Sequence, residues 1–170
     1  MRANPGASAG ELVIIGGGLL QVPNVEEARK LGLRTLVTDS NPNCVCASIA
    51  DEFFAIDIFD IGKHVELVLD LQRRGRRVRG VFAAGIDANV TAAVAARAGN
   101  LPGVEPRAAY VAHQKHVARE VLSAAGVPVP KFAAVASSAE GQQEAKRIGY
   151  PLIVKNTDAS ASRGTTKMYA

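Results

Sequence analysis

Short apolar runs alternate with helical patterns between residues 11 and 99, and this rhythm limits the possible folds more than any other feature. Four strand-like runs are continuously apolar or nearly so, as in strands buried on both faces of a sheet: 12–15, 35–38, 53–56 and 81–84. Helical patterns cover 23–31, 61–74 and 87–98. Strands joined by helices predict a doubly wound parallel α/β sheet with right-handed crossovers, which binds ligands beyond the carboxyl ends of its strands.

The rhythm changes near Pro106, where the pattern becomes helix, strand, helix, strand, loop, strand. The expected elements are a helix that contains Lys115, a strand within 127–135, a helix over 138–148 and two strands around the loop 156–165. We therefore expect a flexible tail over 1–10, a Rossmann-like domain over 11–105 and a second, α+β domain over 106–170. Because Ala170 lies inside the last expected strand, we expect that second domain to be truncated.

Composition excludes several classes of protein. With 48% hydrophobic and 21% charged residues the chain is globular rather than disordered. It has no apolar run near the roughly 18 residues of a membrane span, and its first ten residues lack the apolar core of a signal peptide. We therefore expect a cytoplasmic protein with no membrane partner.

The two cysteines, Cys44 and Cys46, are expected to be reduced thiols. They lie one residue apart, where a disulfide between them has poor geometry, and a metal site would need more ligands. No metal site is therefore expected in this chain.

A basic run, Arg73-Arg74-Gly75-Arg76-Arg77, has two interpretations. It could bind nucleic acid, or it could be the solvated end of a helix, where positive charge opposes the helix dipole. No aromatic residues are interleaved with it, so we favour the helix end and expect no nucleic-acid partner.

Two loops of the first domain carry candidate substrate-binding residues. Three glycines follow the first strand, but Gln21 stands where the dinucleotide pattern GxGxxG needs its last glycine, which disfavours a nicotinamide-dependent oxidoreductase. Asp39 could bind a ribose hydroxyl or cap a turn, and the loop after the fourth strand could offer backbone donors to an anion or only cap the next helix. The candidates are Gly16, Gly17, Gly18, Leu19, Leu20, Gly85 and Asp87.

A candidate phosphate site lies in the second domain. The apolar run 152–154 ends at Lys155, and a loop of small and hydroxylated residues follows over 159–164. Small side chains let backbone N–H groups surround an anion, and a lysine adds a mobile positive charge. This is not a Walker A motif, because its lysine precedes the loop. A solvent-exposed hairpin with an unrelated lysine is the alternative.

Three features in this order resemble the start of the ATP-grasp fold: Lys115, the phrase AGVPVP at 125–130, and GYPLIVK at 149–155 followed by the loop. That fold occurs in biotin carboxylase, the carbamoyl-phosphate synthase large subunit and phosphoribosylglycinamide synthetase. The resemblance reaches back to IGGGLLQVP and implies a pre-ATP-grasp domain followed by an incomplete ATP-grasp subdomain. The ATP-binding residues that it implies are Lys115, Lys155, Ser160, Ser162, Arg163 and Gly164.

The chain departs from the family's pattern inside this loop. Asn156 stands where proline is usual, and Ala159 and Ala161 stand where glycines are frequent. We therefore expect this loop to be stiffer than the family's glycine-rich loop, although alanine still permits fairly close backbone approach.

The resemblance implies an ATP-dependent carboxylate–amine (or ammonia) ligase that acts through an acylphosphate. ATP and a small carboxylate or amine would be its ligands, the first domain would hold part of the acceptor, and a homodimer stays open. The Mg²⁺ ligands would lie downstream of Ala170, so we expect this chain by itself to be inactive and to contain no catalytic residue. A non-catalytic Rossmann-like binding module is the alternative.

Overall fold

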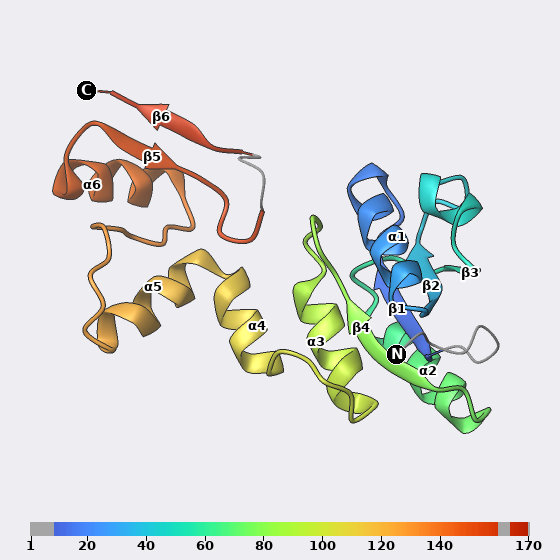
Figure 1. Ribbon diagram of the computed structural model, residues 1–170. Coiled ribbons are helices and arrows are strands. Elements are labelled where there is room, and N and C mark those ends of the chain that lie inside the picture. The colour runs from blue at the N-terminus through green and yellow to red at the C-terminus, as the bar shows by residue number, and fades with distance from the viewer. Residues whose placement is uncertain (1–8, 160–163, 170) are drawn as a thin grey trace. The chain divides into compact units, whose positions relative to one another are not determined.

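The computed structural model describes residues 9–159 and 164–169 (Figure 1). The chain divides into two compact units, Met1–Ala109 (unit 1) and Tyr110–Ala170 (unit 2). None of the helices in the described ranges is long and apolar enough to cross a membrane.

Unit 1 is built on a parallel four-stranded sheet in the order β3-β2-β1-β4. Its strands are β1 (Glu11–Ile15), β2 (Arg34–Asp39), β3 (Glu52–Ala55) and β4 (Val78–Phe82). β1 is central, and its Val13 pairs with Leu36 of β2 and with Val81 of β4. The predicted parallel α/β class is confirmed.

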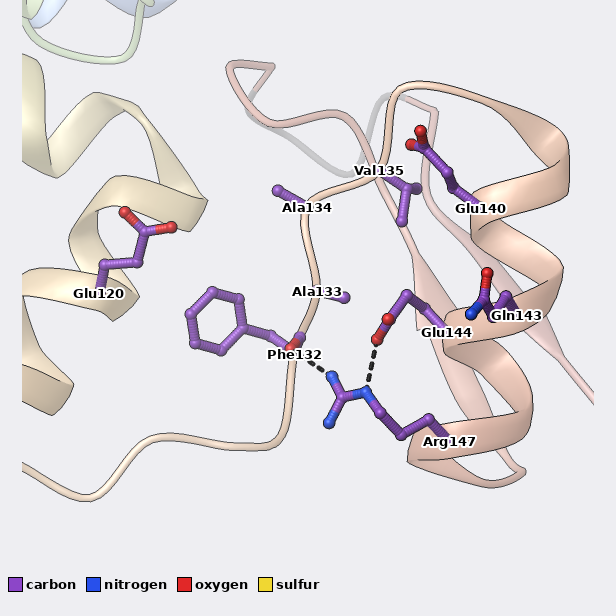
Figure 2. A pocket seen from close by; sticks show the side chains of 9 residues that line it. All are labelled: Glu120, Phe132, Ala133, Ala134, Val135, Glu140, Gln143, Glu144 and Arg147. Carbon is purple, nitrogen blue, oxygen red and sulfur yellow. Dashed lines mark hydrogen bonds and ion pairs between the residues drawn. The ribbon is translucent and has the colours of Figure 1, made fainter.

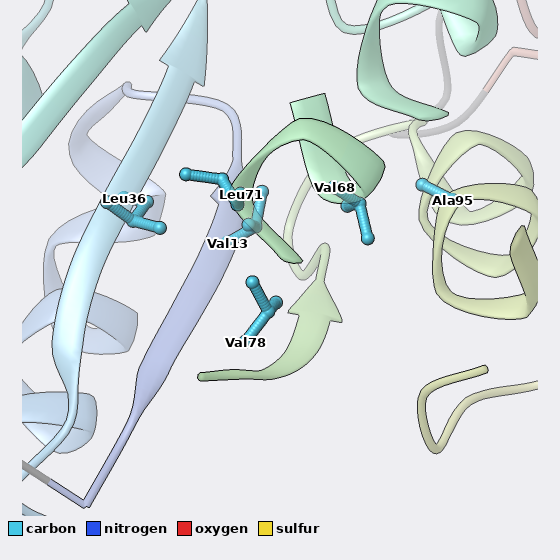
Figure 3. Packing of buried hydrophobic residues seen from close by; sticks show 6 residues of the cluster. All are labelled: Val13, Leu36, Val68, Leu71, Val78 and Ala95. Atoms are coloured by element: carbon cyan, nitrogen blue, oxygen red, sulfur yellow. The ribbon is translucent and has the colours of Figure 1, made fainter. Parts of the chain in front are cut away.

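Helices cover both faces of this sheet (Figure 1). The helix α1 (Val22–Lys30) packs on one face, where Val25 and Ala28 join Ile14 and Val37. The helices α2 (Ile61–Arg73) and α3 (Asn89–Ala98) pack on the other face. Figure 3 shows the core on that second face, which consists of Val13, Leu36, Val68, Leu71, Val78 and Ala95.

Four charged residues join the amino ends of the four strands. Arg76 donates two hydrogen bonds to Glu11, both of 2.7 Å, and two to Glu52, of 2.9 and 2.7 Å. Arg34 adds a contact of 3.2 Å to Glu11 and one of 2.9 Å to Glu52. The interpretation of the basic run as a solvated helix end is therefore wrong for Arg76, whose guanidinium completes this ion-pair cluster.

Unit 2 contains helices and one short hairpin. The helix α4 (Pro106–His113) spans the boundary between the units, and α5 (Lys115–Ala124) and α6 (Ser138–Ile148) follow. The strands β5 (Leu152–Val154) and β6 (Thr166–Met168) pair antiparallel, with Val154 opposite Thr166. The Ser137 hydroxyl accepts a hydrogen bond from the Glu140 amide and so caps α6.

The strand expected within 127–135 is wrong, because that segment carries no strand in the structure. Pro128 and Pro130 lack the N–H that a strand ladder needs, so the apolar composition there produced a false expectation.

Candidate functional site

Three loops of unit 1 meet at the carboxyl ends of β1, β2 and β4. The Gly17 amide donates to Asp39 Oδ2 at 2.8 Å, and the Gln21 side-chain amide donates to the Ala84 carbonyl at 2.7 Å. The Cys46 amide donates to the Gly17 carbonyl at 2.9 Å. The loop after β1 is thus fixed to both neighbouring loops.

The sheet order makes this meeting point a natural ligand crevice. The chain builds β2 and β3 on one side of β1 and then places β4 on its other side. Open α/β sheets bind ligands where the strand order reverses in this way, beyond the carboxyl ends of the strands. We call the region formed by Gly16–Leu20, Asp39 and Gly85 the switch-point crevice.

The glycines of the crevice allow close approach between loops. A Cβ on Gly16, whose φ is 93°, would lie 2.6 Å from Ile86 Cδ1. A Cβ on Gly17 would collide with Cys44 Sγ and would lie 3.3 Å from Asp39 Cβ. Packing of the three loops therefore explains these glycines without a bound dinucleotide.

Two exposed leucines lie in the loop that follows β1. Leu19 is 75% exposed and Leu20 is 71% exposed, within the 3-10 helix η1 (Leu19–Gln21). A Cβ on Gly85 would lie 3.2 Å from Leu20 Cβ, so the two loops touch at this point. Asp87 follows Gly85 by two residues, and α3 begins at Asn89 with Ala88 as its N-cap.

Two titratable groups beside the crevice are buried. His64 Nδ1 donates to the Asp60 carbonyl at 2.8 Å, so Nε2 accepts from the Thr38 hydroxyl at 2.9 Å. Burial lowers the pKa of His64 and raises the pKa of the Cys46 thiol, so both groups stay neutral. The buried position of His64 and its hydrogen bond to Thr38 were not predicted from the sequence, although His64 lies four residues before Val68 on the apolar face of a helix.

The structure brings Lys115 of unit 2 against the segment that follows β5. Lys115 Nζ donates to the Ala159 carbonyl at 2.5 Å and lies 3.5 Å from the Thr157 carbonyl. The Lys115 backbone amide also donates to the Thr157 carbonyl, at 2.9 Å. The first residue of α5 thus lies beside the candidate phosphate loop.

The exposed Lys155 follows β5 directly, and no acidic side chain lies within 4.0 Å of it among residues 9–159 and 164–169. Gly164, with a φ of 65°, touches the Asn156 side chain, since a Cβ there would lie 2.7 Å from Asn156 Nδ2. Asn156 therefore packs against Gly164 where the two ends of the candidate phosphate loop meet, a contact that was not predicted from the sequence. The remaining predicted ATP ligands, Ser160, Ser162 and Arg163, lie outside the described residues.

A hollow of about 420 Å³ lies on unit 2 between α6 and the segment 132–135, with Glu120 of α5 at its rim (Figure 2). Arg147 crosses its floor, with Nε 2.6 Å from Glu144 Oε2 and Nη2 3.4 Å from the Phe132 carbonyl. Glu140 accepts from the Ala136 amide at 2.8 Å. None of the predicted site residues lines this hollow.

No group of three or more His, Cys, Asp or Glu side chains within the described ranges could hold a metal ion.

No protein-family model matches the chain. An uncharacterized protein of Sinorhizobium fredii is 32% identical over 142 residues, which are 82% of this chain and 30% of that protein. The carbamoyl phosphate synthase large chain of Beutenbergia cavernae is 39% identical over 67 residues, which are 39% of this chain and 6% of that protein. The chain thus spans less than a third of these relatives.

Solved structures share the fold over most of the chain. N5-carboxyaminoimidazole ribonucleotide synthetase of Thermotoga maritima matches 95% of this chain and 41% of its own, with a TM-score of 0.71 and 23% identity. Phosphoribosylglycinamide synthetase of Anaerococcus prevotii matches 88% and 37%, with a TM-score of 0.67 and 26% identity. L-amino acid ligase of Bacillus licheniformis matches 96% and 40%, with a TM-score of 0.73 and 22% identity.

The fold of this chain therefore matches the N-terminal part of this class of ligases and synthetases. More narrowly, these neighbours are ATP-grasp ligases, so the fold matches the N-terminal part of that fold family and the predicted resemblance is confirmed.

Proposed function

We propose that this chain is the N-terminal part of an ATP-dependent carboxylate–amine (or ammonia) ligase that acts through an acylphosphate. The contact of Lys115 Nζ with the Thr157 and Ala159 carbonyls carries the proposal, since it brings a distant cation to the segment that follows Lys155. The fold shared with several ATP-grasp ligases supports it.

In this proposal Lys115 and Lys155 hold the ATP phosphates. An ammonium has three N–H donors, and the Thr157 and Ala159 carbonyls engage at most two of those on Lys115. Lys155 is exposed and has no acidic neighbour in the described part of the chain, so its charge is available to an anion. The loop 159–164, closed at its base by Asn156 and Gly164, would cover the phosphates.

The switch-point crevice of unit 1 would hold part of the acceptor. The neighbours' names include ribonucleotide synthetases and an L-amino acid ligase, so they leave the class of acceptor open. ATP would phosphorylate a carboxylate, and the acceptor, an amine or ammonia, would then displace the phosphate from the acylphosphate. By the family resemblance, Mg²⁺ would be held by residues beyond this chain, and the chain alone would be inactive.

One neighbour, a biotin carboxylase domain from Hydrogenobacter thermophilus, was solved as a dimer with MgADP and bicarbonate. In this proposal, a homodimer is the oligomeric state to test for this protein.

Trapping of the acylphosphate tests the proposal. The full-length protein that contains this chain is incubated with MgATP, a panel of small carboxylates and hydroxylamine, which converts an acylphosphate to a hydroxamate. We expect hydroxamate and ADP in equal amounts for at least one carboxylate. ADP release without hydroxamate, or no ADP release with any carboxylate, would contradict the ligase assignment and favour a binding module.

A further inference from the structure

The charges of unit 1 are separated between the two edges of its sheet. Between β1 and α3, its arginines lie at strand starts or in the last turns of helices, at the amino edge of the sheet. The described segments after the four strands, 16–21, 40–51, 56–60 and 83–88, contain no lysine or arginine. Lys63, in the first turn of α2, is the nearest cation along the chain, and its Nζ already lies 3.1 Å from Asp60 Oδ2.

The glycine loop is also poorly prepared for a phosphate. Glycine-rich turns before a helix bind phosphate through free backbone amides. Here the Gly16 amide donates to the Thr38 carbonyl at 2.7 Å, and the Gly17 amide donates to Asp39 Oδ2 at 2.8 Å. A phosphate on the next amides would lie beside the Asp39 carboxylate, and the described segments after the four strands offer it no lysine or arginine as a countercharge, which is unfavourable.

The same carboxylate suits a positive group. Asp39 Oδ1 accepts from the Asn41 amide at 2.9 Å and Oδ2 accepts from Gly17. Each carboxylate oxygen has two lone pairs, so each can accept one further hydrogen bond. The exposed Leu19 and Leu20 follow Gly17, the partner of Asp39, by two and three residues and offer apolar surface to a side chain of the ligand.

We infer that the switch-point crevice receives an unphosphorylated amine with an apolar side chain, bound in its ammonium form by Asp39. This inference rests on the proposed function, because it names the class of acceptor for that ligase. It concerns recognition of the acceptor, in which Asp39 supplies the negative charge and the two leucines supply the apolar contact.

Binding of two amines to the 170-residue chain tests the inference by NMR. Leucinamide carries an ammonium and an apolar side chain, whereas O-phosphoethanolamine carries an ammonium and a phosphate. We expect leucinamide to shift the amide signals of Gly17 to Leu20, and O-phosphoethanolamine to bind at least about tenfold more weakly. Tighter binding of O-phosphoethanolamine at these amides, or no shift with leucinamide, would overturn the inference.

The variant Asp39→Asn keeps an oxygen for the Gly17 amide but removes the charge. It should weaken leucinamide binding about tenfold, because a charge-assisted hydrogen bond is lost. The matched control is Asp70→Asn in α2, which pairs with Arg74 and should leave binding unchanged. If both substitutions weaken leucinamide binding equally, Asp39 does not bind the ammonium. If Asp39→Asn fails to fold, the comparison of leucinamide with O-phosphoethanolamine on the unaltered chain still tests the inference.

The hydroxamate assay separates failure of this inference from failure of the proposed function, because hydroxylamine replaces the acceptor amine there. Hydroxamate formation without leucinamide binding would reject the acceptor class and keep the ligase. Absence of hydroxamate would reject the ligase, and the inference with it.

Discussion

At the residue level, Arg76 donates four charge-assisted hydrogen bonds at the amino edge of the sheet. Its partner Glu11 is only 5% exposed, so removing the guanidinium would leave a nearly buried carboxylate with only Arg34 beside it. Breaking such a pair from one side is usually strongly destabilising.

We predict that Arg76→Ala lowers the free energy of unfolding by about 3 kcal/mol, measured by urea denaturation at pH 7. The matched control is Arg77→Ala, because Arg77 is exposed and its neighbour in the same run; its effect should stay within about 0.5 kcal/mol. Equal effects for the two variants would show that the ion-pair cluster does not stabilise unit 1.

The difference in the free energy of unfolding between the wild type and Arg76→Ala should depend on pH. The Arg76 hydrogen bonds hold the pKa of Glu52 below its usual value of 4.5, despite the opposing effect of burial. The resulting stabilisation is present above that value and is lost as the pH falls through the lowered pKa of the folded state. The gap between the wild type and Arg76→Ala should therefore narrow below about pH 4.

His64 provides a second prediction with a different pH window. Burial holds its pKa below the usual value of 6.5, so the unfolded chain takes up a proton that the folded chain refuses. Wild-type stability should therefore fall as the pH drops below about 6.5, by up to about 1.4 kcal/mol per pH unit until the folded-state pKa is reached.

The variant His64→Gln should be less stable at pH 7.5 but should lose most of this slope. Urea midpoints between pH 5 and 7.5 measure it. An unchanged slope in the variant would mean that another group titrates.

At the scale of elements, the loops at the carboxyl edge fit closely because glycine leaves room for neighbouring side chains. A Cβ on Gly17 would meet Cys44 Sγ, so Gly17→Ala should destabilise unit 1 by about 2 kcal/mol through overpacking. The double variant Gly17→Ala with Cys44→Ala removes that sulfur and should recover about half of the loss. Thermal denaturation of the wild type and the two variants measures both effects, and a double variant no more stable than Gly17→Ala would contradict this packing.

Different elements were predictable from the sequence to different degrees. β1 was clear because a strand buried on both faces is continuously apolar, whereas β4 begins three residues earlier than expected, since Arg79 and Gly80 interrupt its apolar run. The loop contacts of Gly17 with Asp39 and of Lys115 with Ala159 join positions distant along the chain. Only the three-dimensional fold fixes such pairs, and only the family resemblance pointed to Lys115.

At the scale of the whole molecule, burial is unequal between the two units. Every buried side chain among the described residues belongs to unit 1, and none lies in 110–159 or 164–169. Low burial means that local opening requires little free energy.

We predict that the amides of α5 and α6 exchange with solvent at least about tenfold faster than those of β1 and β2 in hydrogen exchange of this chain. Equal protection in both units would show that unit 2 is stabilised by surfaces that its described residues do not reveal.

We propose that unit 2 begins an ATP site in which Lys155 holds phosphate. The ATP affinity of the Lys155→Ala variant of the full-length protein measures this contribution. Loss of one charge-assisted contact, about 1.5–3 kcal/mol, should weaken ATP affinity about 10- to 150-fold. Lys155→Arg should recover only part, because the planar guanidinium needs different room, and the exposed Lys131→Ala serves as the matched control. We expect a large loss of ATP affinity for Lys155→Ala and none for Lys131→Ala; wild-type affinity in Lys155→Ala would show that Lys155 holds no phosphate.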